Sequence, residues 1–331
     1  SFEELVDLLC DPTVEKRTHD SKSLFGALLA QGLTPAAFTL DAALAAYLLN
    51  PLSSDYSLAR LLPEYGFAAE EPLHTFPALC DRLSALVEEQ GMTALLTEVE
   101  QPLSLVLADM EQQGVAVDRE GIAAFGGELT ARIATLQRDI FAQVGYEFNL
   151  NSPKQLGELL FEKLGLPPVK KTKTGYSTNA DVLEKLKSKH PIIPAIMDYR
   201  MLTKLKSTYA DGLMKVIGED GRIHTTFQNL VTATGRLSST EPNLQNIPVR
   251  TDLGAEIRKM FIAAPGNVLV DADYSQIELR VLAHIADDAV MQQAFREIQP
   301  DSEGNIDDAF LRKIIESCES IVKNDTPGKT E

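Results

Sequence analysis

The most constraining feature of this chain is a short apolar run that leads directly into acidic residues and then into a helical pattern. Residues 267–270 (Asn-Val-Leu-Val) have the composition of a buried strand, and Asp271 and Asp273 follow them. Apolar residues then recur four positions apart, as on one face of a helix, at Ile277, Val281 and Ile285. A carboxylate at the end of a buried strand suits a hard divalent cation such as Mg²⁺, which binds oxygen ligands and is often shared with substrate phosphates.

The composition predicts a globular protein of more than one domain. The 331 residues are enough for two or three domains with substantial cores. No run of eighteen apolar residues is present, so no transmembrane helix is expected. The 3 cysteines are isolated and form neither a metal-ligand spacing nor a disulfide framework, which favours a reducing cytoplasm.

The net charge of −17 argues against nucleic-acid binding until it is divided along the chain. Residues 1–120 hold 6 Lys and Arg against 20 Asp and Glu, whereas residues 151–216 hold 12 against 6. A concentrated positive segment fits phosphate contact, because Lys and Arg displace the counterions condensed on a polyanion. A solvated charged face is the alternative.

Apolar periodicity predicts a chain dominated by helices. Residues 40–49 have the pattern of a buried helix, and two long amphipathic helices are expected at 103–113 and 118–144. Asp118 is the expected N-cap of the second, and Gly114 and Gly145 are the expected helix ends. Further helices are expected at 153–164, 181–189 and 193–209, and a strand at 224–230.

A second constellation occupies residues 232–250 and has the composition of a loop. It is rich in small residues and side-chain amides, which suit hydrogen bonding to the acceptors of the DNA minor groove, where the base pairs look alike. A well-packed turn region with Arg236 in a structural ion pair is the alternative.

The two constellations together resemble the A family of DNA-dependent DNA polymerases, the bacterial DNA polymerase I type. The resemblance is carried by residues 271–280 and 232–250 and is continuous from about 99 to 297. It implies an α+β, multidomain fold. The implied parts are a degenerate exonuclease-like (ribonuclease H-like) α/β remnant at 1–95, a helical thumb at 96–215, a partial antiparallel palm sheet at 216–297 and an atypical tail helix in 298–331.

The resemblance also implies a two-metal site for phosphoryl transfer with Mg²⁺. Asp273 and the backbone carbonyl of Tyr274 would hold metal, although a lone Asp at this place is also a typical helix cap. Glu278 would be a buried acid that excludes a ribose 2′-hydroxyl, although a solvent-facing helix acid is the alternative. With Arg236 at the primer end, Asp273 and Glu278 form the expected catalytic set. The expected nucleotide-binding residues are Tyr274, Ser275, Gln276, Glu278 and Arg250.

Contacts to primer–template DNA are implied for two groups of residues. The basic segment would grip duplex phosphates without sequence preference. Its expected members are Lys170, Lys171, Lys173, Ser177, Arg200, Lys204 and Lys206. The loop would read the minor groove through Thr234, Arg236, Asn243, Gln245 and Asn246.

The first 95 residues resemble the 3′–5′ exonuclease domain that accompanies such polymerases, but only in outline. A working exonuclease needs several carboxylates around two metals, and Asp20 alone cannot hold them. We therefore expect this segment to be an inactive platform.

The resemblance ends after residue 297, before the expected fingers and the second catalytic carboxylate, and an amphipathic helix is expected at 308–322. The function implied is template-directed addition of deoxynucleotides in DNA replication or repair by a cytoplasmic monomer, with no membrane contact. Its partners would be primer–template DNA and deoxynucleoside triphosphates. This chain alone is expected not to extend a primer. A non-catalytic primer–template binding module is the alternative, and a nuclease is disfavoured by the missing acids.

Overall fold

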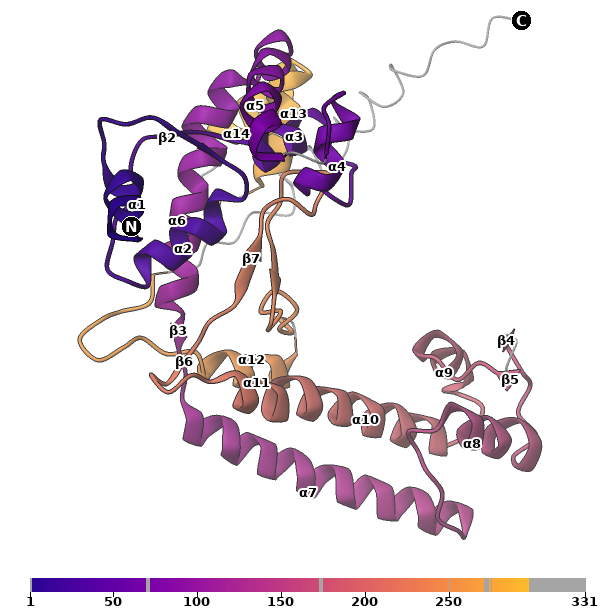
Figure 1. Ribbon diagram of the computed structural model, residues 1–331. Coiled ribbons are helices and arrows are strands. Elements are labelled where there is room, and N and C mark those ends of the chain that lie inside the picture. Colours follow the sequence, from indigo (N-terminus) through magenta and orange to yellow (C-terminus); the bar gives the residue numbers. More distant parts are fainter. Residues whose placement is uncertain are drawn as a thin grey trace, which may run out of the picture. The chain divides into compact units, whose positions relative to one another are not determined.

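The computed structural model describes residues 2–69, 72–172, 175–249, 251–270, 274 and 276–297 (Figure 1). The chain separates into two compact units, Ser1–Val268 and Leu269–Glu331. The architecture mixes many helices with few short strands, as an α+β chain should. Within the described ranges, every helix is too short or too polar to cross a membrane. The tail helix expected at 308–322 lies outside the described residues.

The N-terminal segment is built on two parallel strands, β1 (Lys16–Thr18) and β2 (Phe38–Asp41), which pair Lys16 with Phe38 and Thr18 with Asp41. β2 leads at once into α3, whose N-cap is Asp41. α3 is apolar on all sides, so its burial on all sides follows from its sequence. The helices of this segment are α1 (Phe2–Cys10), α2 (Ser21–Leu29), α3 (Ala42–Leu49), α4 (Leu58–Glu64) and α5 (Pro72–Glu89), followed by the π-helical stretch η1 (Leu95–Glu100).

Two long helices follow, close to the predicted bounds: α6 (Gln101–Gln113) and α7 (Arg119–Val144). The Asp118 side chain accepts a hydrogen bond from the backbone N–H of Gly121 at 2.9 Å, which confirms the expected cap. Gly114 ends α6 with a φ of +58°, and a Cβ there would lie 2.8 Å from the Ile223 carbonyl oxygen. Only glycine fits this close approach of two backbones.

The basic segment is helical and packs against the far half of α7. α10 (Ile192–Leu205) lies alongside α7 (Figure 1), and the chain continues through η3 (Lys206–Ala210) into α11 (Asp211–Val216). Ile192, Ile193 and Ile196 of α10 form one cluster with Ile140 of α7. Buried residues of η3 and α11 belong to a second cluster with Leu129 of α7. The remaining elements are α8 (Pro153–Gly157), η2 (Glu158–Lys163), β4 (Lys171–Thr172), β5 (Gly175–Tyr176) and α9 (Ala180–Leu186).

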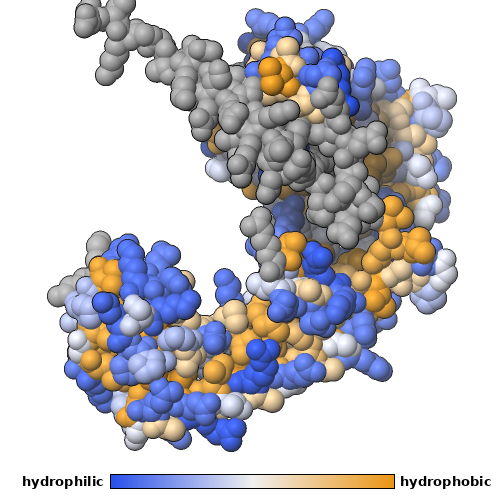
Figure 2. All heavy atoms as spheres, turned by 180° about the vertical axis from the view of Figure 1, so that it is seen from behind, coloured by the Kyte–Doolittle hydropathy of each residue, from blue (hydrophilic) through white to orange (hydrophobic). Residues whose placement is uncertain are grey.

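The next segment contains antiparallel strand pairs. β3 (Val115–Ala116) pairs with β6 (Arg222–Ile223), and β7 (Thr226–Gln228) pairs with β8 (Ser238–Thr240). Each pair is a separate two-stranded sheet, so antiparallel pairing is present while a palm sheet stays a prediction. The helix α12 (Asp252–Lys259) follows and contributes Ile257 to a core shared with α7. Figure 2 shows hydrophobic and hydrophilic side chains intermixed over the coloured part of the face that it presents.

The second unit contains α13 (Ile277–Ile285) and α14 (Ala289–Glu297), which pack through Ala283, Met291 and Phe295. The prediction of a buried strand at 267–270 is wrong, because these residues belong to no strand. Val268, Leu269 and Val270 are 80%, 63% and 84% exposed. A strand with three consecutive apolar residues needs neighbours on its edges and faces, and the described residues supply none here.

Candidate nucleic-acid interface

Residues 225–245 form a hairpin braced by buried hydroxyl groups. The hydroxyl oxygens of Thr225 and Ser239 lie 2.6 Å apart, and both side chains are buried. Thr225 also donates to the Pro242 carbonyl at 2.8 Å, while the Ser239 hydroxyl accepts from the N–H of Leu244 at 3.0 Å. Buried polar atoms must find partners, so the Thr225 and Ser239 hydroxyl groups hold the two sides of this hairpin together.

The tip of the hairpin presents Thr234 and Arg236 to the surface, and both are exposed. The Thr232 hydroxyl donates to the Arg236 carbonyl at 2.6 Å and closes the turn. Gly235 has a φ of +78°, which a side chain would strain. The turn is therefore defined by its own hydrogen bond while its side chains face outward.

The side-chain amides beyond β8 are also exposed but differ in the hydrogen bonds that these residues make. The Asn243 side chain accepts from the Gln245 N–H at 3.0 Å and shapes a turn. The Gln245 amide donates to the Leu237 carbonyl at 3.0 Å, so it ties this turn to the hairpin. The Asn246 side chain is exposed, and its backbone carbonyl accepts from the Tyr209 hydroxyl. Arg250 lies outside the described residues.

The basic residues fall into two groups that the sequence did not separate. Lys170 and Lys204 are exposed. Arg200 is half-buried and donates to the Thr178 carbonyl at 2.5 Å, and burial lowers the pKa of its guanidinium. Lys206 forms an ion pair with Asp211 at 2.7 Å. Ser177 donates its backbone N–H to the Lys170 carbonyl at 2.9 Å, while Lys173 and the side chain of Lys171 lie outside the described residues.

The acidic motif is described only in part. Asp271, Asp273 and Ser275 lie outside the described residues. Tyr274 is 79% exposed, and Gln276 has a left-handed backbone, with a φ of 56°, just before α13.

Glu278 is exposed in the first turn of α13, so the expectation of a buried acid at this position is wrong. A carboxylate there interacts favourably with the helix dipole in water. Two residues on, the Arg280 guanidinium lies 4.8 Å from the centre of the Phe295 ring.

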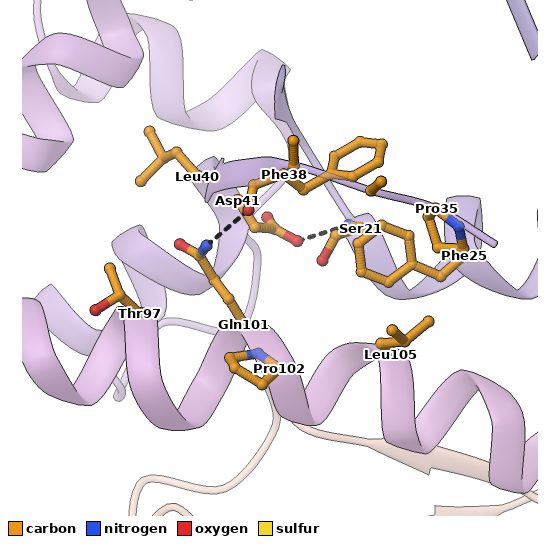
Figure 3. A pocket seen from close by; sticks show the side chains of 12 residues that line it. Ser21, Phe25, Pro35, Phe38, Leu40, Asp41, Thr97, Gln101, Pro102 and Leu105 are labelled. Carbon is orange, nitrogen blue, oxygen red and sulfur yellow. Dashed lines mark hydrogen bonds between the residues drawn. The ribbon is translucent and has the colours of Figure 1, made fainter. Parts of the chain in front are cut away.

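A pocket of about 190 Å³ lies between α2, β2 and α6 (Figure 3). Asp41 faces it, and its carboxylate accepts from four backbone N–H groups, those of Asp20, Ser21, Ala43 and Leu44. Asp20 is the N-cap of α2 and accepts from the Ser23 hydroxyl at 2.6 Å. In the part of the chain that the structure describes, no three His, Cys, Asp or Glu residues gather as a metal site would require.

The N-terminal segment is joined to the hairpin by contacts that sequence reasoning missed. The Tyr47 hydroxyl donates to the Thr232 carbonyl at 2.7 Å. Lys22 pairs with Glu111 at 2.5 Å, and the same Glu111 oxygen accepts from the N–H of Phe227 at 2.7 Å. No local pattern signals these contacts, because the partners lie between 89 and 185 positions apart.

Comparison with known proteins gives consistent results. A sequence model described as DNA polymerase family A matches residues 119–310. The chain is 45% identical over 316 residues to DNA polymerase I of Geobacillus stearothermophilus, covering 87% of this chain and 36% of that protein. It is 43% identical over 309 residues to DNA polymerase I of Bacillus subtilis, covering 85% and 35%. The chain thus spans about a third of the length of the curated relatives it matches.

A solved structure resembles the whole fold. It is described as the POL domain of Pol1 from M. smegmatis in complex with DNA primer-template and dNTP. The TM-score is 0.79 at 34% sequence identity, over 97% of this chain and 60% of that one. On the extent of the family match and the identity to these relatives, this chain belongs to DNA polymerase family A.

Proposed function

We propose that this chain is the part of a DNA-directed DNA polymerase that grips primer–template duplex DNA. The observation that carries the proposal is the braced hairpin within the family match, whose turn presents Arg236 and Thr234. Such a turn is suited to minor-groove acceptors, because its backbone is held by hydrogen bonds while the side chains of Thr234 and Arg236 are exposed. Asn243, Gln245 and Asn246 would extend the same contact surface.

The basic segment would supply affinity through phosphates. Lys170 and Lys204 are exposed and suited to direct contact, with Lys171, Lys173 and Ser177 beside the former. Arg200 and Lys206 already bind Thr178 and Asp211, so they also organise this segment. Because a guanidinium has five N–H donors, the bonds of Arg200 to Thr178 leave donors for a phosphate.

The domain roles follow the same proposal. Residues 1–95 would be a degenerate exonuclease-like support, 96–215 a thumb, 216–297 a partial palm and 298–331 a tail. In the full-length protein, the chemistry would be addition of deoxynucleotides to a primer 3′ end during replication or repair. That protein would act as a monomer in the bacterial cytoplasm, where chromosomal DNA and deoxynucleoside triphosphates occur.

The residues proposed for the chemistry are Asp273 and the Tyr274 carbonyl as metal ligands. Glu278 would select the sugar, and Tyr274, Ser275, Gln276 and Arg250 would lie near the nucleotide. The two metal ligands are hard oxygen donors, the kind that Mg²⁺ prefers. With a single carboxylate they would form a weak site, because Mg²⁺ gives up water reluctantly and needs geometry as well as charge. We therefore propose that the 331-residue chain binds primer–template DNA without extending it. This corresponds to the alternative of a non-catalytic primer–template binding module.

The test is a binding and extension assay on the 331-residue chain. Fluorescence anisotropy with a labelled primer–template, over a series of salt concentrations, should give an affinity that falls steeply with salt. Arg236→Ala should weaken binding about tenfold, because a charged hydrogen bond contributes roughly 1.5 kcal/mol. Gel-resolved primer extension with Mg²⁺ should show no added nucleotide.

Arg82→Ala is the matched control, because Arg82 is an exposed arginine on α5 and its loss changes the net charge equally. Binding should be unchanged in this variant. Equal weakening by both substitutions would show that only net charge matters and would contradict the proposed site. Template-dependent extension would contradict the binding-only role.

A further inference from the structure

Tyr47 connects the buried core of the N-terminal segment to the turn that presents Arg236. It lies on α3, is 2% exposed and packs edge-on against the Tyr56 ring. Its hydroxyl leaves this core to donate to the Thr232 carbonyl at 2.7 Å. Leu230 packs against the same core, so the chain is anchored just before the turn as well.

Thr232 links Tyr47 to Arg236 through two hydrogen bonds. Its carbonyl accepts from Tyr47, and its hydroxyl donates to the Arg236 carbonyl at 2.6 Å. Thr232 therefore connects the backbone at both ends of the turn to α3. Ala233, Thr234, Gly235 and Arg236 of this turn are all exposed.

A second link holds the base of the same hairpin. Lys22 of α2 pairs with Glu111 of α6, and these two side chains are only 12% and 23% exposed. The paired Glu111 oxygen accepts from the N–H of Phe227 in β7. The N-terminal segment thus contacts the hairpin directly at Thr232 and is linked to its base through Glu111 of α6.

We infer that the exonuclease-like segment serves as a positioning support for the DNA-reading turn, and that Tyr47 is its positioning residue. This inference rests on the proposed function and deepens it. Tyr47 touches no DNA. Its hydrogen bond selects one placement of residues 232–236, so that Arg236 is held ready before DNA arrives. The support role gives the segment a use that does not depend on nuclease chemistry.

Tyr47→Phe tests the inference because it removes the hydroxyl and keeps the buried ring. Tyr56→Phe is the matched control, since the Tyr56 hydroxyl also donates to a backbone carbonyl at 2.7 Å, that of Asn50 within the segment. We expect the full chain with Tyr47→Phe to bind primer–template about fivefold more weakly, which corresponds to about 1 kcal/mol. Tyr56→Phe should bind as the unaltered chain does, although both variants lose one hydrogen bond.

Two further measurements separate positioning from general stability. In an Arg236→Ala background, Tyr47→Phe should cause no additional loss of affinity, because both changes act on one contact. Amide hydrogen exchange at residues 231–237 should accelerate about fivefold in Tyr47→Phe and stay unchanged in Tyr56→Phe.

The outcomes distinguish this inference from the proposed function. If the unaltered chain binds DNA and Tyr47→Phe binds equally well, the support role is overturned while the proposed function stands. If the unaltered chain does not bind DNA, the proposed function fails. In that case hydrogen exchange still decides whether Tyr47 orders the turn, and equal exchange in the two Phe variants overturns the inference.

Discussion

The helices α3 and α13 follow similar sequence patterns but differ in burial. α3 follows the apolar run of β2 and Asp41, and α13 follows the apolar run 267–270 and its acids. Six consecutive residues of α3 are buried, from Ala42 to Tyr47. By contrast, Ile277, Val281 and Ile285 on α13 are 41%, 46% and 76% exposed. A local sequence pattern therefore specifies a helix, whereas neighbours decide whether its apolar face is covered.

Thiol labelling should show the largest difference between the two regions. Cys80 of α5 is fully buried, and burial raises the pKa of its thiol from 9.0 to about 11. In a Val281→Cys variant we expect the new thiol on α13 to react with iodoacetamide at least about a thousandfold faster than Cys80, because Cys80 needs an opening of the core. Mass spectrometry of peptides after labelling at pH 8 would resolve the sites.

The raised pKa of the Cys80 thiol also predicts how the stability of the fold changes with pH. Its folded-state pKa lies above the ordinary value, so folding favours the neutral thiol. This contribution to stability is fully present below pH 9.0 and is lost as pH rises towards about 11. In urea both thiols should react alike. Labelling of Cys80 within tenfold of the Val281→Cys thiol in the folded chain would contradict the buried environment.

Truncation of one side chain in each helix should give the next largest effect. Leu44→Ala removes a side chain that is 1% exposed, and we expect it to lower the local free energy of opening of α3 by about 3 kcal/mol. Val281→Ala should change that of α13 by less than about 0.5 kcal/mol, because its side chain is half in water. Amide hydrogen exchange, read separately on each helix, is the measurement. A loss above 2 kcal/mol at α13 would mean that its apolar face is covered.

The helix caps should give the smallest effect, with opposite signs. Asp41→Ala leaves buried N–H groups without an acceptor, so we expect α3 to lose about 2 kcal/mol. Gln276 makes no capping hydrogen bond through its side chain and has a left-handed backbone. Gln276→Gly should therefore stabilise α13 by up to about 1 kcal/mol, since glycine tolerates that conformation. The same exchange experiment reports both, and a loss of stability in Gln276→Gly would show that the glutamine side chain matters.

The elements that were predictable from sequence are those whose signals are local. α7 was expected from its apolar period and from Asp118 and Gly145, and all three were confirmed. The helical nature of α10 and of residues 153–163 followed from the same kind of pattern. The strand prediction for residues 267–270 was wrong because apolar composition indicates only a preference for burial. That preference is satisfied only when the segment pairs with other strands.

The candidate site divides in the same manner. The motif at 232–250 was expected to be a loop, and Thr234 and Arg236 lie exposed in a turn, while their contact with DNA stays a prediction. The motif around Glu278 suggested a buried acid, whereas the described helix exposes it. Among the basic residues, composition alone could not distinguish the exposed Lys204 from Arg200, which is bonded to Thr178.

By itself the sequence determined the family, the long helices with their caps, and the residue types of the turn at 232–236, because each of these is encoded in a few neighbouring positions. Only the tertiary structure decided what holds that turn. The Tyr47 hydroxyl and the Thr232 carbonyl are brought together across 185 positions. A hydrogen bond between such distant groups depends on the packing of every element between them, so no local sequence pattern can predict it.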